Sequence, residues 1–174
     1  ELARDHRVLC YDPRGTGEST RSGPYDTETD AEDLAALLEQ AGAPGAVVIG
    51  IANACEVAVI LAARHRDLVR GIVVPSGNPA GLRAARRSET MAGSEGVLEA
   101  LGGMVENDYR SALWTVLTSG NPGMDEDEIR RRIDTQADYC AAEVAAARLR
   151  AWIEVDCLEE ARSLGDRLHI LLSA

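Results

Sequence analysis

The sequence has no lysine and no phenylalanine, so all 18 of its basic residues are arginines. They are outnumbered by 29 acidic residues, which leaves a formal net charge of −11 at pH 7. Proteins that bind nucleic acids or anionic membrane surfaces use clustered cations to attract phosphate groups. The shortage of positive charge therefore argues against both kinds of partner. The lack of lysine beside abundant alanine and arginine is typical of a GC-rich bacterial genome.

Metal-binding patterns and long apolar runs are missing as well. The cysteines are scattered without a C-x-x-C pair, and no histidine stands at metal-ligand spacing, so we expect no metal and no cofactor. We expect all four thiols to be reduced and buried: Cys10, Cys55, Cys140 and Cys157. No apolar stretch approaches the about 18 residues of a membrane span, and no signal-peptide pattern is present. A cytoplasmic protein is the expectation.

The glycine-rich segment from Asp12 to Ser19 lacks the spacing of a phosphate-binding loop. A P-loop continues into Lys-Ser or Lys-Thr, and the dinucleotide pattern G-x-G-x-x-G needs a third glycine, which this segment does not supply. A nucleotide-binding function is therefore not expected. With 45% hydrophobic and 27% charged residues, the chain has the composition of one ordinary globular domain.

Residues 46–62 combine a strand, a very short turn and a helix. Ala46 to Ile49 is a short apolar run rich in β-branched residues, as in a buried strand of a parallel sheet. From Asn53 onward the apolar residues follow the spacing of one helical face, namely Ala54, Val57, Ala58, Leu61 and Ala62. Almost no residues remain for the turn between them, and we expect the functional residues there.

This turn, Gly50 to Cys55, resembles the nucleophile elbow of the α/β-hydrolase family, G-x-S-x-G, with Ala52 at the serine position. The elbow crowds the residues two before and two and three after the nucleophile, and these are the small Gly50, Ala54 and Cys55. The resemblance implies that Ala52 has a positive φ and that the backbone N–H of Asn53 is an oxyanion donor. An ordinary turn between strand and helix, with packing roles only, is the alternative.

A second match precedes the elbow. Asp12 to Ser19 is similar to the D-x-R-G-x-G-x-S turn that follows an early strand in many α/β hydrolases. The family resemblance implies a three-layer α/β fold with a parallel central sheet and helices on both faces. We expect parallel strands at about residues 7–11, 46–51, 70–75 and 168–173.

Residues 79–155 have a helical pattern throughout and resemble the family's inserted cap, so the expected core is 1–78 with 156–174. Helix starts are predicted near Ser94, Asp108 and Asp125, with breaks at 102–103 and 119–123. Most of the aromatic residues fall in this segment. Together with Ile51, they are predicted to line an apolar pocket over the elbow: Tyr109, Trp114, Tyr139 and Trp152. Holding the helices of the insert together is the alternative role for each aromatic ring.

The family implies attack by serine, activated by histidine, on a small apolar ester, thioester, lactone or amide. Ala52 offers no nucleophile, which leaves three explanations: a serine replaced by alanine, a natural enzyme with non-covalent chemistry such as proton transfer or cyclisation, or a non-catalytic binding protein. Cys55 is a further candidate nucleophile, because a thiol in the first turn of a helix can have a lowered pKa.

Other parts of the family's machinery are not found within the sequence. The acid and histidine of the triad are expected after Ala174, and the strand with the oxyanion loop before Glu1. In the family this strand lies between those at 7–11 and 46–51, so we expect these two not to pair directly and the chain to be incomplete at both ends. The three histidines are expected to be structural or on the surface: His6, His65 and His169.

Overall fold

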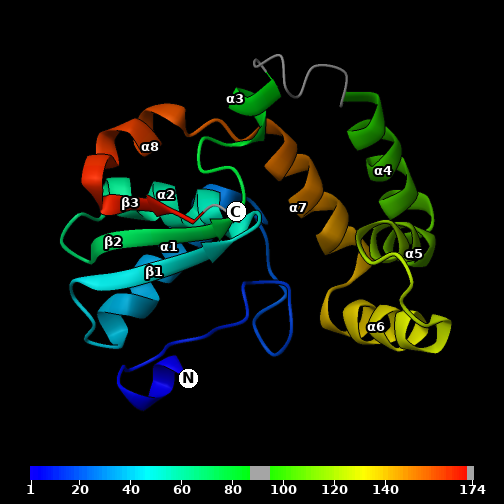
Figure 1. Cartoon of the computed structure of the whole chain (residues 1–174), viewed down its shortest axis with the longest axis horizontal. Coiled ribbons are helices and arrows are strands. Elements are labelled where there is room, and N and C mark those ends of the chain that lie inside the picture. Colours follow the sequence, from blue (N-terminus) through cyan, green and yellow to red (C-terminus); the bar gives the residue numbers. More distant parts are fainter. Residues whose placement is uncertain (87–94, 172–174) are drawn as a thin grey trace.

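The computed structural model describes residues 1–86 and 95–171, which form a sheet region and a helical region side by side (Figure 1). The sheet has three parallel strands in the order β1-β2-β3. Their bounds are β1 (Ala46–Ile51), β2 (Val69–Ser76) and β3 (Leu168–Ile170). These strands confirm the predictions at 46–51 and 70–75 and the first half of the one at 168–173, since β3 ends at Ile170 and residues 172–174 lie outside the described part of the chain.

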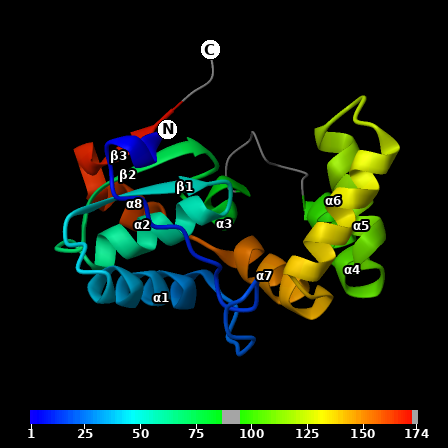
Figure 2. The same ribbon diagram turned by 90° about the horizontal axis from the view of Figure 1, so that it is seen from below.

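Three helices cover one face of the sheet, as Figure 2 shows. They are α1 (Thr27–Gln40), α2 (Ala54–Arg64) and α8 (Leu158–Leu164). The main hydrophobic core lies between them and the strands, and Val59, Leu61 and Ile72 are fully buried there. Successive side chains of a strand point to opposite faces, so Val47 and Ile49 of β1 face away from this core and are about half exposed, at 46% and 48%.

The prediction of a strand at residues 7–11 is wrong. This segment forms no strand ladder with any described residue, and its side chains Val8 and Leu9 are exposed. A strand is stabilised by its hydrogen-bonded neighbours, and no backbone hydrogen bond joins residues 7–11 to another described segment. As expected, it does not pair directly with β1. Cys10 lies on this segment and is exposed, so the prediction of a buried thiol fails for that residue.

The helical region lies beyond the carboxyl ends of β1 and β2 (Figure 1). Its helices are α3 (Leu82–Arg86), α4 (Glu95–Asn107), α5 (Tyr109–Gly120), α6 (Glu126–Tyr139) and α7 (Ala142–Glu154). Elsewhere in the chain, short 3-10 turns precede α1, at η1 (Leu2–Arg4), and β3, at η3 (Gly165–Arg167). A second, smaller apolar cluster holds α4, α5 and α7 together around Val105, Ala112 and Ala146.

Two of the predicted helix starts are confirmed. The Asp108 carboxylate accepts the N–H of Ser111, and the Asp125 carboxylate accepts the N–H groups of Asp127 and Glu128. Ser94 falls outside the described residues. The predicted break at 102–103 is wrong, since both glycines lie inside α4; a glycine costs only about 1 kcal/mol within a helix, which packing against α5 and α7 offsets. None of the helices among the described residues is long and apolar enough to span a membrane.

Candidate functional site

The turn between β1 and α2 carries the unusual backbone conformation that the sequence predicts. Ala52 has φ of 54°, the one positive φ at a non-glycine residue in the described part of the chain. An alanine in this region costs roughly 1–2 kcal/mol, because its Cβ approaches the following carbonyl oxygen. Two hydrogen bonds hold the turn: the Ala52 N–H donates to Ser76 O at 2.7 Å, and the Cys55 N–H donates to Ala52 O at 3.1 Å.

Close packing around the turn is confirmed for two of the three predicted residues. A Cβ on Gly50 would lie 2.7 Å from both Ala54 O and Cys55 Cα, and the Cys55 side chain is fully buried. From the end of β2, Gly77 approaches so closely that its Cβ would lie 2.5 Å from Ala52 O. The prediction is wrong for the Ala54 side chain, which is exposed because only its carbonyl oxygen faces Gly50.

A cavity of about 520 Å³, the large cavity, opens over this turn at the carboxyl ends of the strands. Parallel α/β sheets bind their ligands at this edge. The large cavity is lined by Pro13, Thr16, Ala52, Asn53, Tyr109, Gln136, Tyr139, Cys140, Ala145, Arg148, Leu149 and Trp152. Among the described residues, no acceptor takes the backbone N–H of Asn53. The structure thus brings together Ala52, Asn53 and three of the predicted aromatic residues.

Two predicted pocket residues are wrong. Trp114 lines neither the large cavity nor the smaller cavity described below. The Arg130 guanidinium lies 5.5 Å from the centre of the Trp114 ring, so the ring packs between α5 and α6. This is the alternative role in which an aromatic ring holds the insert together. Ile51 is 59% exposed and also lines neither cavity.

Tyr139 links the large cavity to the glycine-rich turn. Its phenol donates to Asp12 Oδ1 at 3.0 Å, with the Thr16 hydroxyl 3.3 Å from the phenol oxygen, and the Gly17 N–H donates to Tyr139 O at 2.8 Å. Burial, followed by the neighbouring Asp12, raises the pKa of Tyr139. The phenol therefore stays protonated at neutral pH and acts as a hydrogen-bond donor.

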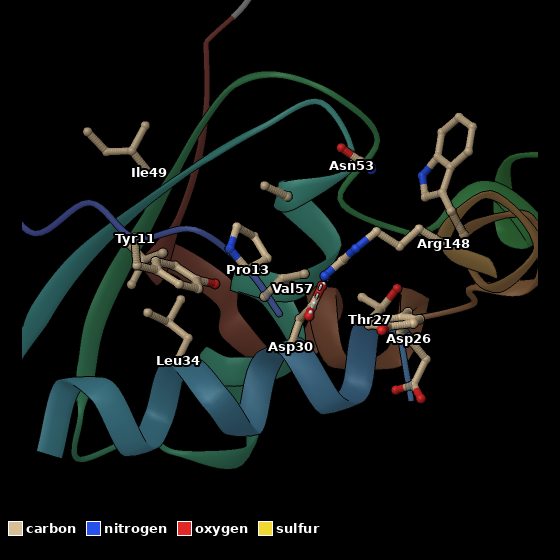
Figure 3. A pocket seen from close by; sticks show the side chains of 14 residues that line it. Tyr11, Pro13, Asp26, Thr27, Asp30, Leu34, Ile49, Asn53, Val57 and Arg148 are labelled. Carbon is tan, nitrogen blue, oxygen red and sulfur yellow. Dashed lines mark hydrogen bonds and ion pairs between the residues drawn. The ribbon is translucent and has the colours of Figure 1, made fainter. Parts of the chain in front are cut away.

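Arg148 is a cavity residue that the sequence did not reveal. Both of its terminal nitrogens donate to the Asp30 carboxylate of α1, and Nη2 also donates to Arg14 O at 2.7 Å. Figure 3 shows Arg148 reaching Asp30 across a smaller cavity of about 170 Å³, the small cavity. The only sequence signal was an arginine one helical turn before Trp152 in an alanine-rich stretch.

Glu56 is a second polar residue of the site that the sequence did not reveal. Its carboxylate is 1% exposed and accepts Trp152 Nε1–H at 3.0 Å and the Cys55 thiol at 3.2 Å. Burial raises the pKa of Cys55, and the adjacent Glu56 raises it further. The hypothesis of a Cys55 nucleophile with a lowered pKa is therefore wrong, because the thiolate is disfavoured.

Histidines do not contribute to either cavity within the described residues. His65 lies at the end of α2 with its Nε2 3.1 Å from Glu32 Oε2, and His169 is exposed on β3. In residues 1–86 and 95–171, no group of three or more histidine, cysteine or acidic side chains is placed to hold a metal ion. The large cavity therefore offers hydrogen-bond donors and apolar walls. The methyl group of Ala52 cannot form a covalent bond to a carbonyl carbon.

The comparisons with known proteins agree with this geometry. Residues 1–92, more than half of the chain, match the model of the family described as alpha/beta hydrolase fold, and the chain belongs to that family. It is 36% identical over 73 residues to a putative carbamate hydrolase RutD of Caulobacter segnis, covering 40% of this chain and 27% of that protein. It is 35% identical over 75 residues to the sn-1-specific diacylglycerol lipase ABHD11 of Mus musculus, covering 43% of this chain and 24% of that one.

Solved structures with the same fold extend the likeness over most of the chain. A bromoperoxidase from Bacillus anthracis superposes with a TM-score of 0.73 at 20% identity, covering 86% of this chain and 57% of that one. An esterase from Exiguobacterium antarcticum has a TM-score of 0.69 at 14% identity, with 86% and 56% covered. The chain thus spans little more than half the length of these structures, and about a quarter of each curated relative is matched.

Proposed function

We propose that the large cavity binds a small, mostly apolar ester, thioester, lactone or amide, with Ala52 at the nucleophile position of a hydrolase elbow. The observation that carries this proposal is the positive φ of Ala52 where β1 meets α2, beside the N–H of Asn53 on the cavity wall, which donates to no acceptor among the described residues. The names of two relatives, a carbamate hydrolase and a diacylglycerol lipase, support a carbonyl compound as the ligand.

In this proposal residues 79–155 act as the cap, and residues 1–78 with 156–174 form the core beneath it. The two apolar clusters support the division, since one joins the sheet with α1, α2 and α8 and the other joins α4, α5 and α7. Tyr109, Tyr139 and Trp152 then line the pocket from the cap side, while Ala52 and Asn53 face it from the core.

The Asn53 N–H would donate a hydrogen bond to the carbonyl oxygen of the ligand. Such a donor stabilises negative charge on that oxygen, but acyl transfer also needs a nucleophile, and the Ala52 methyl group supplies none. With alanine at position 52, the chain therefore binds its ligand without forming an acyl intermediate.

A ligand-binding measurement tests this proposal. In a Trp114→Phe background, where Trp152 is the remaining tryptophan, heptan-2-one should change the fluorescence saturably with a Kd on the order of 1 mM, as expected for eight non-hydrogen atoms. Gln136→Phe, on the cavity wall, should weaken binding about tenfold, while its exposed α6 neighbour Thr135→Phe should not. Equal affinities in these two variants would contradict binding in the large cavity.

A non-covalent enzyme is the second candidate, and Tyr139, a residue of the large cavity whose phenol is hydrogen-bonded to Asp12, favours it. A phenol hydrogen-bonded to a carboxylate can pass a proton from a ligand to that carboxylate, and a reaction without a covalent intermediate can use such a relay.

Introducing a hydroxyl group at position 52 tests whether this cavity can support acyl transfer. We expect both the Ala52 chain and Ala52→Ser to remain unlabelled by a fluorophosphonate probe: Ala52 has no nucleophile, and no histidine among the described residues reaches the cavity to accept a proton from the serine. Ala54→Ser, one helical position from the turn, is the matched control. Labelling of Ala52→Ser that disappears in Ala52→Ser/Tyr139→Phe would contradict the expectation and identify the Tyr139–Asp12 pair as the base.

A further inference from the structure

A carboxylate lies buried beneath the turn that holds Ala52, and the proposed ligand binding does not use it. Glu56 occupies the first turn of α2 and is 1% exposed. Burying a charge is costly unless hydrogen bonds compensate, so a buried acid in this position needs partners. Two donors supply them: the indole N–H of Trp152 and the thiol of Cys55.

The partners of Glu56 belong to two different parts of the fold. Cys55 is fixed to the turn, since a Cβ on Gly77 would lie 2.7 Å from its Sγ and the side chain is fully buried. Trp152 comes from α7, in the helical region, and is separated from Glu56 by 96 positions in the sequence. The carboxylate therefore connects the turn at the end of β1 with a helix of the cap.

Trp152 stands between the two cavities. It lines both of them, and so do Pro13, Asn53 and Arg148, so these four side chains form the shared wall. Trp152 and Arg148 are one helical turn apart on α7, and each is held by an acid of the core: Glu56 and Asp30. Beyond this wall, the small cavity is bordered by apolar side chains that include Leu34, Val48 and Val57.

We propose that Trp152 is a specificity-determining residue that closes the large cavity against the small one, and that Glu56 is the positioning residue that holds its indole there. The proposal rests on the proposed function, because it limits the size of the ligand bound in the large cavity. With the indole held, a linear ligand ends at the shared wall. With the indole released, its chain extends into the small cavity.

The expected effect on affinity follows from the apolar surface that the ligand buries. Each buried methylene contributes about fourfold in affinity, from about 0.8 kcal/mol per group. In the native chain the affinity for linear alkan-2-ones should rise with length and then level off at the wall. In Trp152→Ala the rise should continue for several more methylenes.

The first arm of the experiment observes the contact directly and does not depend on ligand binding. In the Trp114→Phe background, Glu56→Leu should shift the Trp152 emission to longer wavelength and increase its quenching by acrylamide. Glu56→Gln keeps a carbonyl acceptor for the indole N–H and should retain the native emission. Unchanged emission in Glu56→Leu would overturn the positioning role.

The second arm measures binding of butan-2-one to decan-2-one by the same variants. Glu56→Leu should lose the length limit, like Trp152→Ala, whose binding is read by intrinsic tyrosine fluorescence because no tryptophan remains, and Glu56→Gln should keep the limit. If Glu56→Leu fails to fold by circular dichroism, Trp152→Phe replaces it, read by intrinsic tyrosine fluorescence, because it keeps a ring and removes the N–H. A native length limit in these variants overturns the proposal. Absence of binding in every variant overturns the proposed function, while the emission of Trp152 still decides the role of Glu56.

Discussion

Gly50→Ala is expected to destabilise the chain by about 3 kcal/mol, at the upper end of the usual cost of overpacking. The new Cβ would lie 2.7 Å from Ala54 O and from Cys55 Cα, and 3.0 Å from Cys55 N. All three are backbone atoms of the turn and of α2, so no side chain can rotate away to make room. Relief requires β1 and α2 to separate, which would displace the strained turn at Ala52.

Thermal unfolding followed by circular dichroism measures this effect, as a decrease in Tm of about 6–12 °C for a chain of this size. Gly102→Ala is the matched control: it lies inside α4, and its Cβ would meet nothing within 4 Å. That substitution should stabilise the chain by about 1 kcal/mol through helix propensity. A Gly50→Ala chain with the native Tm would show that β1 and α2 do not approach as closely as described.

Asp30→Ala is expected to cost about 3 kcal/mol, the lower end of the range for removing one partner of a buried ion pair. Asp30 is 5% exposed and the Arg148 side chain about 21%, so the substitution leaves a guanidinium that water reaches only in part. Arg148 would also lose its fixed position on the shared wall of the cavities. Urea unfolding measures the change in the free energy of unfolding.

Two further variants identify the cause of that loss. Asp30→Leu combined with Arg148→Met replaces the pair by apolar side chains and should recover most of the native stability. Glu128→Ala on α6 removes the partner of Arg131 and Arg132 at exposed positions and should lower the free energy of unfolding far less than Asp30→Ala does. If the double variant is as unstable as Asp30→Ala, the loss comes from packing and not from the uncompensated charge.

Local patterns account for the parts of the fold that were predicted correctly. The change of period at Asn53 places the end of β1 and the start of α2, and the small residues around Ala52 predict its positive φ. The caps at Asp108 and Asp125 depend on residues two or three positions away. The failure at residues 7–11 has the complementary cause, because a strand depends on a neighbour that a local pattern does not contain.

The sequence by itself determined the family, the positions of β1 to β3 along the chain and the turn at Ala52, because each depends on spacing within a few residues or on a motif. Only the tertiary structure decided which side chains surround the cavity. The pairs Asp12–Tyr139, Asp30–Arg148 and Glu56–Trp152 join residues 127, 118 and 96 positions apart. Trp114 and Trp152 have similar helical surroundings in the sequence, yet one packs between α5 and α6 and the other lines the cavities. The direction in which each helix turns its face depends on packing between distant segments, and spacing along one helix does not contain that information.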